Sequence, residues 1–166
     1  MKFEFVTDAH TDDLVVFVLG MKVHRPWRVD QLGFATIAMF RMQAELERNL
    51  RDDASLGYLG GFNALAKQGP IVVQYWRSFE ELERYARSDD HRHRPAWLKM
   101  YQLTHSARGV GYGLWHETYR VPAGEHEAIY GNMAGEGLGR AVGTVALSRR
   151  GRTSRERMNA QASMSA

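Results

Sequence analysis

The sequence predicts an α+β fold of the ferredoxin-like type, with one antiparallel sheet and helices on one of its faces. A length of 166 residues suits a single domain. Segments with strand and helix patterns follow one another as strand, helix, strand, strand, helix, helix and strand, which contains the ferredoxin-like order. That arrangement leaves one face of the sheet uncovered. Since a second copy of so small a chain would cover it, we expect a two-fold homodimer.

The first third of the core predicts a strand followed by a long helix. Residues 13–23, DLVVFVLGMKV, are rich in β-branched side chains, which is typical of a buried strand. Pro26 ends regular pairing, and Asp30 is the N-cap that we expect for a helix over 31–50. Apolar residues three or four positions apart define the face that this helix should bury: Leu32, Ala35, Met39, Met42 and Leu46.

The rest of the core predicts two more strands, two helices and a last strand. Residues 56–65 and 71–77 have strand patterns, and the second of them, IVVQYWR, is the clearest in the chain. Ser78 and Glu81 have the spacing of a capping box, which predicts that a helix begins there. A further helix should precede residues 114–121, LWHETYRV, which we expect to be the last strand of the sheet.

The two ends of the chain differ in composition from this core. We therefore divide the chain into an N-terminal arm over 1–12, the core domain over 13–133, and an irregular extension over 134–166. The extension contains RRGRTSRER at 149–157, with five arginines and one glutamate. Such a segment is typical of a solvated tail, and we expect it to be disordered at its end. The formal net charge of +3 belongs to this tail, which argues against a nucleic-acid-binding body.

Several classes of site and location are excluded by what the sequence lacks. There is no cysteine, so disulfides, thiolate metal sites and a cysteine nucleophile are absent. The glycine-rich GEGLGR at 135–140 follows the core instead of opening it, so we expect no bound nucleotide. His91 and His93 lack the spacing and partners of a zinc site, and no metal site is expected. Without a signal peptide or a long apolar run, we expect a cytoplasmic protein with no membrane partner.

The stretch LWHETY places an imidazole and a carboxylate side by side among apolar residues. On a strand, His116 and Glu117 would point to opposite faces of the sheet. We expect His116 to be partly desolvated and able to accept a proton near pH 7, either as a general base or as a core histidine held by one hydrogen bond. Glu117 is expected at an interface or rim, with Arg77 or Arg120 as its partner.

Aromatic and methionine side chains suggest a pocket for a flat or hydrophobic ligand. Core packing is the ordinary role of each residue alone, but their number suits such a pocket better than a sugar or nucleotide site. The residues that we expect to contact a substrate are Trp27, Met39, Phe40, Met42, Trp76, Trp97 and Tyr119.

Five stretches together resemble a known family. They are RPWRV at 25–29, QYWRSFEELERYAR at 74–87, the H-x-x-A-W pattern from His93 to Trp97, LWHETYRV and YGNM at 130–133. They resemble a bacterial monooxygenase-like family of the dimeric α+β barrel superfamily, which also holds the antibiotic-biosynthesis monooxygenases and a fumagillin-pathway monooxygenase. The resemblance covers residues 13–133.

This resemblance implies a pocket between the sheet and the helices, and a family with several chemistries. The leading expectation is an oxygenase that needs no cofactor and acts on a small hydrophobic or aromatic metabolite of secondary metabolism, with His116 or His93 as general base. One alternative is a haem b enzyme related to haem oxygenases or aldoxime dehydratases, with His93 as axial ligand. Another is a dimer that binds a hydrophobic ligand without chemistry, since a shared fold does not choose between functions.

Overall fold

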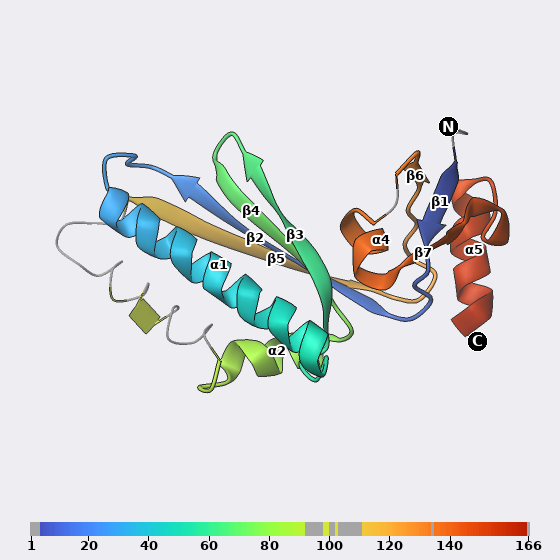
Figure 1. Ribbon diagram of the computed structural model, residues 1–166, viewed down its shortest axis with the longest axis horizontal. Coiled ribbons are helices and arrows are strands. Elements are labelled where there is room, and N and C mark those ends of the chain that lie inside the picture. The colour runs from blue at the N-terminus through green and yellow to red at the C-terminus, as the bar shows by residue number, and fades with distance from the viewer. Residues whose placement is uncertain (1–3, 92–97, 100–101, 103–110, 134, 166) are drawn as a thin grey trace.

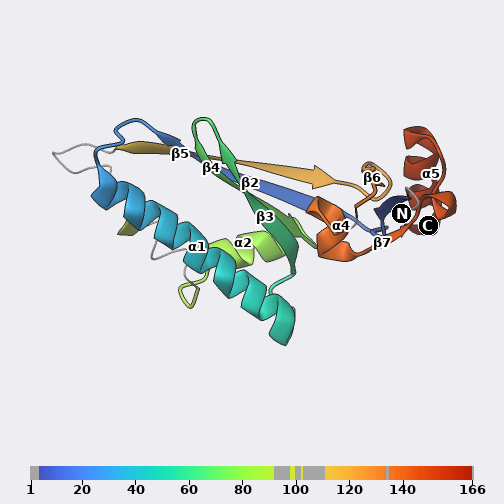
Figure 2. The same ribbon diagram turned by 45° about the horizontal axis from the view of Figure 1, so that its top comes forward.

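Four antiparallel strands form the main sheet of the computed structural model, which describes residues 4–91, 98, 99, 102, 111–133 and 135–165. The sheet order is β3-β4-β2-β5. Its strands are β2 (Leu14–Val23), β3 (Tyr58–Ala66), β4 (Gly69–Trp76) and β5 (Tyr112–Val121). Helices α1 (Val29–Asp52) and α2 (Phe79–Arg87) lie on one side of this sheet (Figures 1 and 2). The predicted ferredoxin-like fold is therefore confirmed.

Helix α1 buries the face that its apolar spacing predicts, but it begins earlier than expected. Ala35, Met39 and Leu46 are buried. The helix begins at Val29, and Asp30 lies in its first turn instead of capping it. The Asp30 carboxylate pairs with the Arg28 guanidinium at 3.1 Å, and this hydrogen bond lowers the pKa of Asp30. Arg28 occupies the N-cap position that the sequence assigned to Asp30.

Helix α2 begins at the predicted capping residue. The Ser78 hydroxyl accepts a hydrogen bond from the backbone N–H of Glu81 at 3.2 Å. The Glu81 carboxylate does not close the capping box, because it pairs with the Arg77 guanidinium one turn before it. Leu82 and Tyr85 are the residues that α2 buries.

The core lies where both helices meet the sheet. Its buried residues come from β2, α1, β3, β4 and α2, and they are Val15, Leu46, Tyr58, Trp76, Leu82 and Tyr85. Burying one large apolar side chain contributes about 1.5–3 kcal/mol to folding. This cluster therefore fixes the position of α2 relative to the sheet.

A second, three-stranded sheet joins the two ends of the chain. Its order is β6-β1-β7, from β1 (Phe5–Asp8), β6 (Tyr130–Gly131) and β7 (Thr144–Ala146). Helices α4 (Gly137–Val142) and α5 (Ser154–Ser165) and a 3-10 helix, η1 (Leu147–Arg149), complete this unit. It lies beyond one end of the main sheet, with both termini beside it (Figures 1 and 2). We call it the terminal sheet.

The segment expected to be an irregular extension contains regular elements, α4, β7 and α5. The residues expected to form a solvated tail include the start of α5, where the Thr153 hydroxyl accepts from the backbone N–H of Glu156 at 3.2 Å. The Glu156 carboxylate accepts in return from the backbone N–H groups of Thr153 and Arg152. This reciprocal capping box stabilises the first turn of the helix within the arginine-rich segment. Among the described helices, none has the length and apolar character needed to cross a membrane.

Candidate functional site

Cross-strand pairing assigns the side chains of the main sheet to two faces. Directly opposite residues in neighbouring antiparallel strands point to the same face. Leu19 pairs with Val72 on β4 and with His116 on β5, so these three side chains share one face. Val15 and Trp76, which pack under the helices, have the same parity along their strands. His116 therefore points towards the helices, and its neighbour Glu117 points to the open face.

A large cavity lies between the sheet and the two helices. Its volume is about 980 Å³, at the upper end of ordinary ligand pockets. Its floor is formed by Phe17, Leu19, Val72, Gln74, Leu114, His116 and Thr118. Helices α1 and α2 contribute Ala35, Ala38, Met39, Met42, Phe79, Leu82, Tyr85 and Ala86, together with Glu83 and Arg87. Most of these side chains are apolar, so the cavity suits a hydrophobic molecule.

His116 lines this cavity, but it is more accessible than the sequence suggested. His116 is exposed, although its ring packs on one side against Phe17. The physical reason is its place on β5, the strand at the edge of the sheet. The imidazole lies over the cavity floor beside Phe17, with 5.6 Å between the ring centroids. A ring at this place can meet both a molecule in the cavity and water.

The predicted substrate-contacting residues divide into three groups. Met39 and Met42 line the cavity, as their helical spacing suggested. Trp76 does not, because it has no exposed surface and forms part of the core. Trp27, Phe40 and Tyr119 are exposed and do not line this cavity. Trp97 and His93 lie outside the described residues.

Glu117 has a different partner from the arginines that we expected. Its carboxylate accepts a hydrogen bond from the Tyr119 hydroxyl on the same open face. The carboxylate raises the pKa of Tyr119, first through this hydrogen bond and then through its charge. Arg77 instead pairs with Glu81, and Arg120 pairs with Glu80 at 3.3 Å. The side chains of both arginines are thus directed to α2.

Metal-ligating side chains do not converge anywhere in the part of the chain that the structure describes. No group of three or more His, Cys, Asp or Glu residues there could hold a metal ion. Within the described part of the chain, the carboxylate partner of His91 is Glu45, with 2.9 Å between Nδ1 and Oε1. Its ring also lies 5.1 Å from that of Tyr85. This pair fastens the chain after α2 to helix α1.

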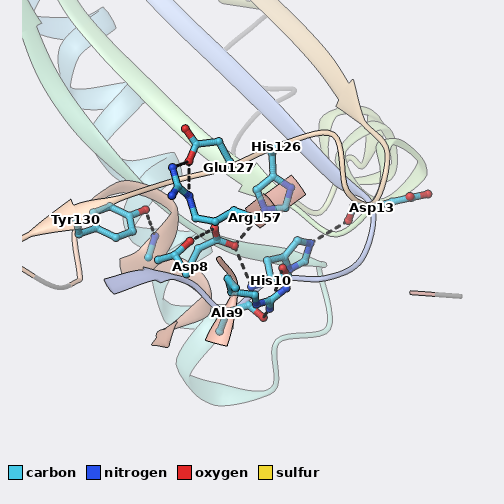
Figure 3. Close-up of polar contacts among 11 residues, drawn as sticks. Asp8, Ala9, His10, Asp13, His126, Glu127, Tyr130 and Arg157 are labelled. Atoms are coloured by element: carbon cyan, nitrogen blue, oxygen red, sulfur yellow. Dashed lines mark hydrogen bonds and ion pairs between the residues drawn. The ribbon is translucent and has the colours of Figure 1, made fainter. Parts of the chain in front are cut away.

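A second polar centre lies in the terminal sheet, around the fully buried Asp8 (Figure 3). One oxygen of its carboxylate accepts from the backbone N–H of His10 at 3.0 Å and contacts Nε2 of His126 at 3.1 Å. Nδ1 of His126 is buried as well. The pair joins β1 to the segment before β6.

Arg157 of helix α5 makes further polar contacts in the same region. The buried Arg157 guanidinium contacts the Glu127 carboxylate at 2.6 Å and donates to the backbone carbonyl of Arg152 at 3.0 Å. Tyr130 accepts a hydrogen bond from the backbone N–H of Gly139 at 2.7 Å (Figure 3). The polar contacts of this region therefore connect α4 and α5 to the strands of the terminal sheet and the segments beside them.

Comparison with known proteins gives one family and several distant structures. A family described as Monooxygenase af470-like matches residues 14–138. No curated protein matches the chain significantly. A Bacteroides thetaiotaomicron protein of unknown function, a possible oxidoreductase, is 10% identical with a TM-score of 0.43, and the match covers 67% of this chain and 99% of that one.

Two further solved structures are similar to the chain at the same level. A dimeric protein of unknown function with a ferredoxin-like fold, from Bacteroides fragilis, is 9% identical with a TM-score of 0.39, over 64% of this chain and 96% of that one. A proposed antibiotic biosynthesis monooxygenase from Caulobacter crescentus is 14% identical with a TM-score of 0.38, over 65% of this chain and 91% of that one. At such scores the likeness carries no functional argument.

Proposed function

The chain belongs to the Monooxygenase af470-like family, and from that membership we propose that it is an oxygenase acting on a small hydrophobic or aromatic metabolite of secondary metabolism. The observation that carries the proposal is the cavity of about 980 Å³ between the sheet and the helices. Its mainly apolar lining favours a flat, hydrophobic molecule over a sugar or a nucleotide. The substrate is held between the sheet floor and the two methionines of α1, Met39 and Met42.

We infer a reaction in which the substrate itself supplies the electrons. His116 removes a proton from an acidic C–H group, and the carbanion forms a C–O bond with molecular oxygen. The resulting peroxide takes up a proton. Its O–O bond then breaks as the second C–H bond of the same carbon is lost, which leaves a carbonyl group and releases water. One oxygen atom enters the product, the other leaves as water, and both electron pairs come from the substrate.

His116 is the described residue best suited to the proton-transfer step. An imidazole changes its charge near neutral pH, so it can take up and return a proton during one turnover. Its ring lies beside Phe17 on the cavity floor, within reach of a bound molecule. The aromatic and aliphatic lining would exclude water from the rest of the substrate and hold it against the base.

We propose that the active protein is a homodimer formed through the open face of the main sheet. That face carries Val16, Val18 and Val73, and also the exposed rings of Trp115 and Tyr119. A second copy would bury this apolar surface, which a monomer leaves in contact with water.

The alternative to the cofactor-free reaction is a haem-dependent one. The resemblance offers His93 as axial ligand, and this residue lies outside the described parts of the chain. A bound haem would supply oxygen chemistry that the side chains lack. The absorption spectrum of freshly purified protein separates the two reactions. A Soret band that is lost in His93→Ala would assign the haem reaction, and a colourless protein that consumes oxygen would assign the cofactor-free one.

Oxygen uptake with a panel of aromatic ketones and phenols tests the proposed function. For a substrate found in this way, His116→Ala should lower kcat by about 10²–10⁴ if His116 is the general base. His24→Ala is the matched control, because His24 is exposed and is not part of the cavity lining. Saturable binding without oxygen uptake would favour a ligand-binding dimer, and an unchanged rate in His116→Ala would remove this residue from the mechanism.

A further inference from the structure

Gln74 is the buried polar side chain of the cavity floor. It lies on β4, directly opposite Phe17, and is only 8% exposed. Its neighbours of the same parity on β4 are Val72 and Trp76, so the amide interrupts an otherwise apolar row. A buried amide without hydrogen-bond partners is costly, so its contacts are informative.

The hydrogen bonds of Gln74 fix the orientation of its amide. The indole Nε1 of Trp76, which can only donate, lies 3.1 Å from Oε1 of Gln74. Nε2 of Gln74 donates to Oε1 of Gln43 on α1 at 3.2 Å. Exchanging the oxygen and nitrogen of Gln74 would set donor against donor at one end and acceptor against acceptor at the other. The orientation of the amide is thus determined.

The same network is anchored at its far end by a carboxylate. Nε2 of Gln43 donates to the hydroxyl oxygen of Tyr58, and that hydroxyl donates to Oε1 of Glu47 at 2.9 Å. Burial, followed by the charge of Glu47, raises the pKa of Tyr58, so the phenol keeps its proton. Donors run in one direction from Trp76 to Glu47, which holds the amide of Gln74 rigid from both sides.

Among the described residues, one hydrogen-bonding position on each end of the Gln74 amide has no partner. An amide nitrogen has two N–H donors, and a carbonyl oxygen accepts two bonds. Among the described residues, Gln43 is the acceptor for the first N–H of Gln74, and a second acceptor is not found there. Because Gln74 lines the cavity, a molecule bound in the cavity can accept from the second N–H.

We propose that Gln74 binds the substrate by donating this N–H to a carbonyl oxygen, an inference that rests on the proposed function. Gln74 and His116 stand on opposite sides of β2, because their strands pair with its two edges. Neighbouring strands are about 4.8 Å apart, and Gln74 and His116 pair with residues two positions apart on β2, so the two groups are separated by roughly 12 Å along the floor. A substrate that spans the floor would therefore place a carbonyl oxygen at Gln74 and its acidic group at His116.

Two probes that differ in a single carbonyl test this inference by calorimetry. They are 6-hydroxy-1-tetralone and 5,6,7,8-tetrahydro-2-naphthol, which share one ring skeleton and one phenol. Gln74→Leu should raise the Kd of the ketone about tenfold, the equivalent of one neutral hydrogen bond, and leave the Kd of the naphthol unchanged. The ketone alone should shift the indole N–H resonance of Trp76, since that N–H is bonded to the Gln74 carbonyl.

A second variant and a matched control distinguish loss of the proposed hydrogen bond from misfolding of the variant. Gln74→Glu keeps an acceptor for the Trp76 indole but replaces the donating nitrogen by oxygen, and it should lose the same ketone preference. Gln68→Leu makes the first substitution at an exposed glutamine in the β3–β4 turn and should keep the preference. Variants at Gln74 that keep the preference, or that weaken both probes equally, overturn the inference and leave the proposed function standing. Wild-type protein that binds neither probe overturns both.

Discussion

The indole of Trp115 lies directly against Gly20, its cross-strand partner on the open face of the main sheet. A Cβ atom at position 20 would overlap three atoms of that ring. The backbone of Gly20 is that of an ordinary strand, because its φ is not among the positive values of the chain. Space for the indole therefore explains this glycine, and conformational freedom does not.

We expect Gly20→Ala to move Trp115 off the sheet. Overpacking of this kind costs about 1–3 kcal/mol, so the free energy of unfolding in urea should fall by that amount. Since Trp115 belongs to the proposed dimer face, the dissociation constant of the dimer should also rise, which sedimentation equilibrium measures. Gly33→Ala is the control, because nothing lies within 4 Å of a Cβ on this helical glycine. That variant should instead gain about 0.5–1 kcal/mol.

Asp8→Ala should destabilise the terminal sheet. The substitution removes the acceptor of the His10 backbone N–H and the partner of the His126 imidazole, both at a buried position. Losing hydrogen bonds made by a fully buried carboxylate costs about 1–3 kcal/mol, which thermal unfolding would register as a lower Tm. Asp12→Ala removes an exposed carboxylate from the same segment and should leave the Tm unchanged. Equal losses in the two variants would contradict the role given to Asp8.

The helicity of α5 should fall in acid. Backbone N–H groups of Arg152 and Thr153 lower the pKa of Glu156, so this carboxylate stabilises the folded state above the pKa that it has when unfolded. That contribution is lost as the pH falls below about 4.3 and through the folded pKa. Amide exchange of α5 between pH 7 and pH 3 measures it. Glu156→Gln should remove this pH dependence, whereas Glu125→Gln, at an exposed site, should preserve it.

Local patterns explain how much of the fold could be predicted. The β-branched run over β2, the apolar spacing along α1 and the capping residue Ser78 each act within a few residues, and the structure contains all three elements. The terminal sheet could not be predicted in this way, because Val6 pairs with Ala146 at the other end of the sequence. A local signal for α5 was nevertheless present in Thr153 and Glu156, whose spacing is that of a capping box.

The cavity was predicted less completely than the fold. Helical spacing identified Met39 and Met42. Strand alternation predicted that His116 and Glu117 point to opposite faces of the sheet. Hydrophobicity and size could not separate Trp76, which fills the core, from residues that meet a ligand. Gln74 was missed, although its parity with Trp76 marks a polar residue at a buried strand position. A polar group at such a position is the signal that could have found it.

Strand β1 can complete its hydrogen bonding only after nearly all the other elements have been synthesised. Its partners β6 and β7 leave the ribosome late, on the order of ten seconds after β1 at ordinary rates of translation. Strands β2 to β5 and helices α1 and α2 are available before β7 is. The ferredoxin-like core can thus assemble on the nascent chain, while β1 stays an unpaired strand until β6 and β7 follow.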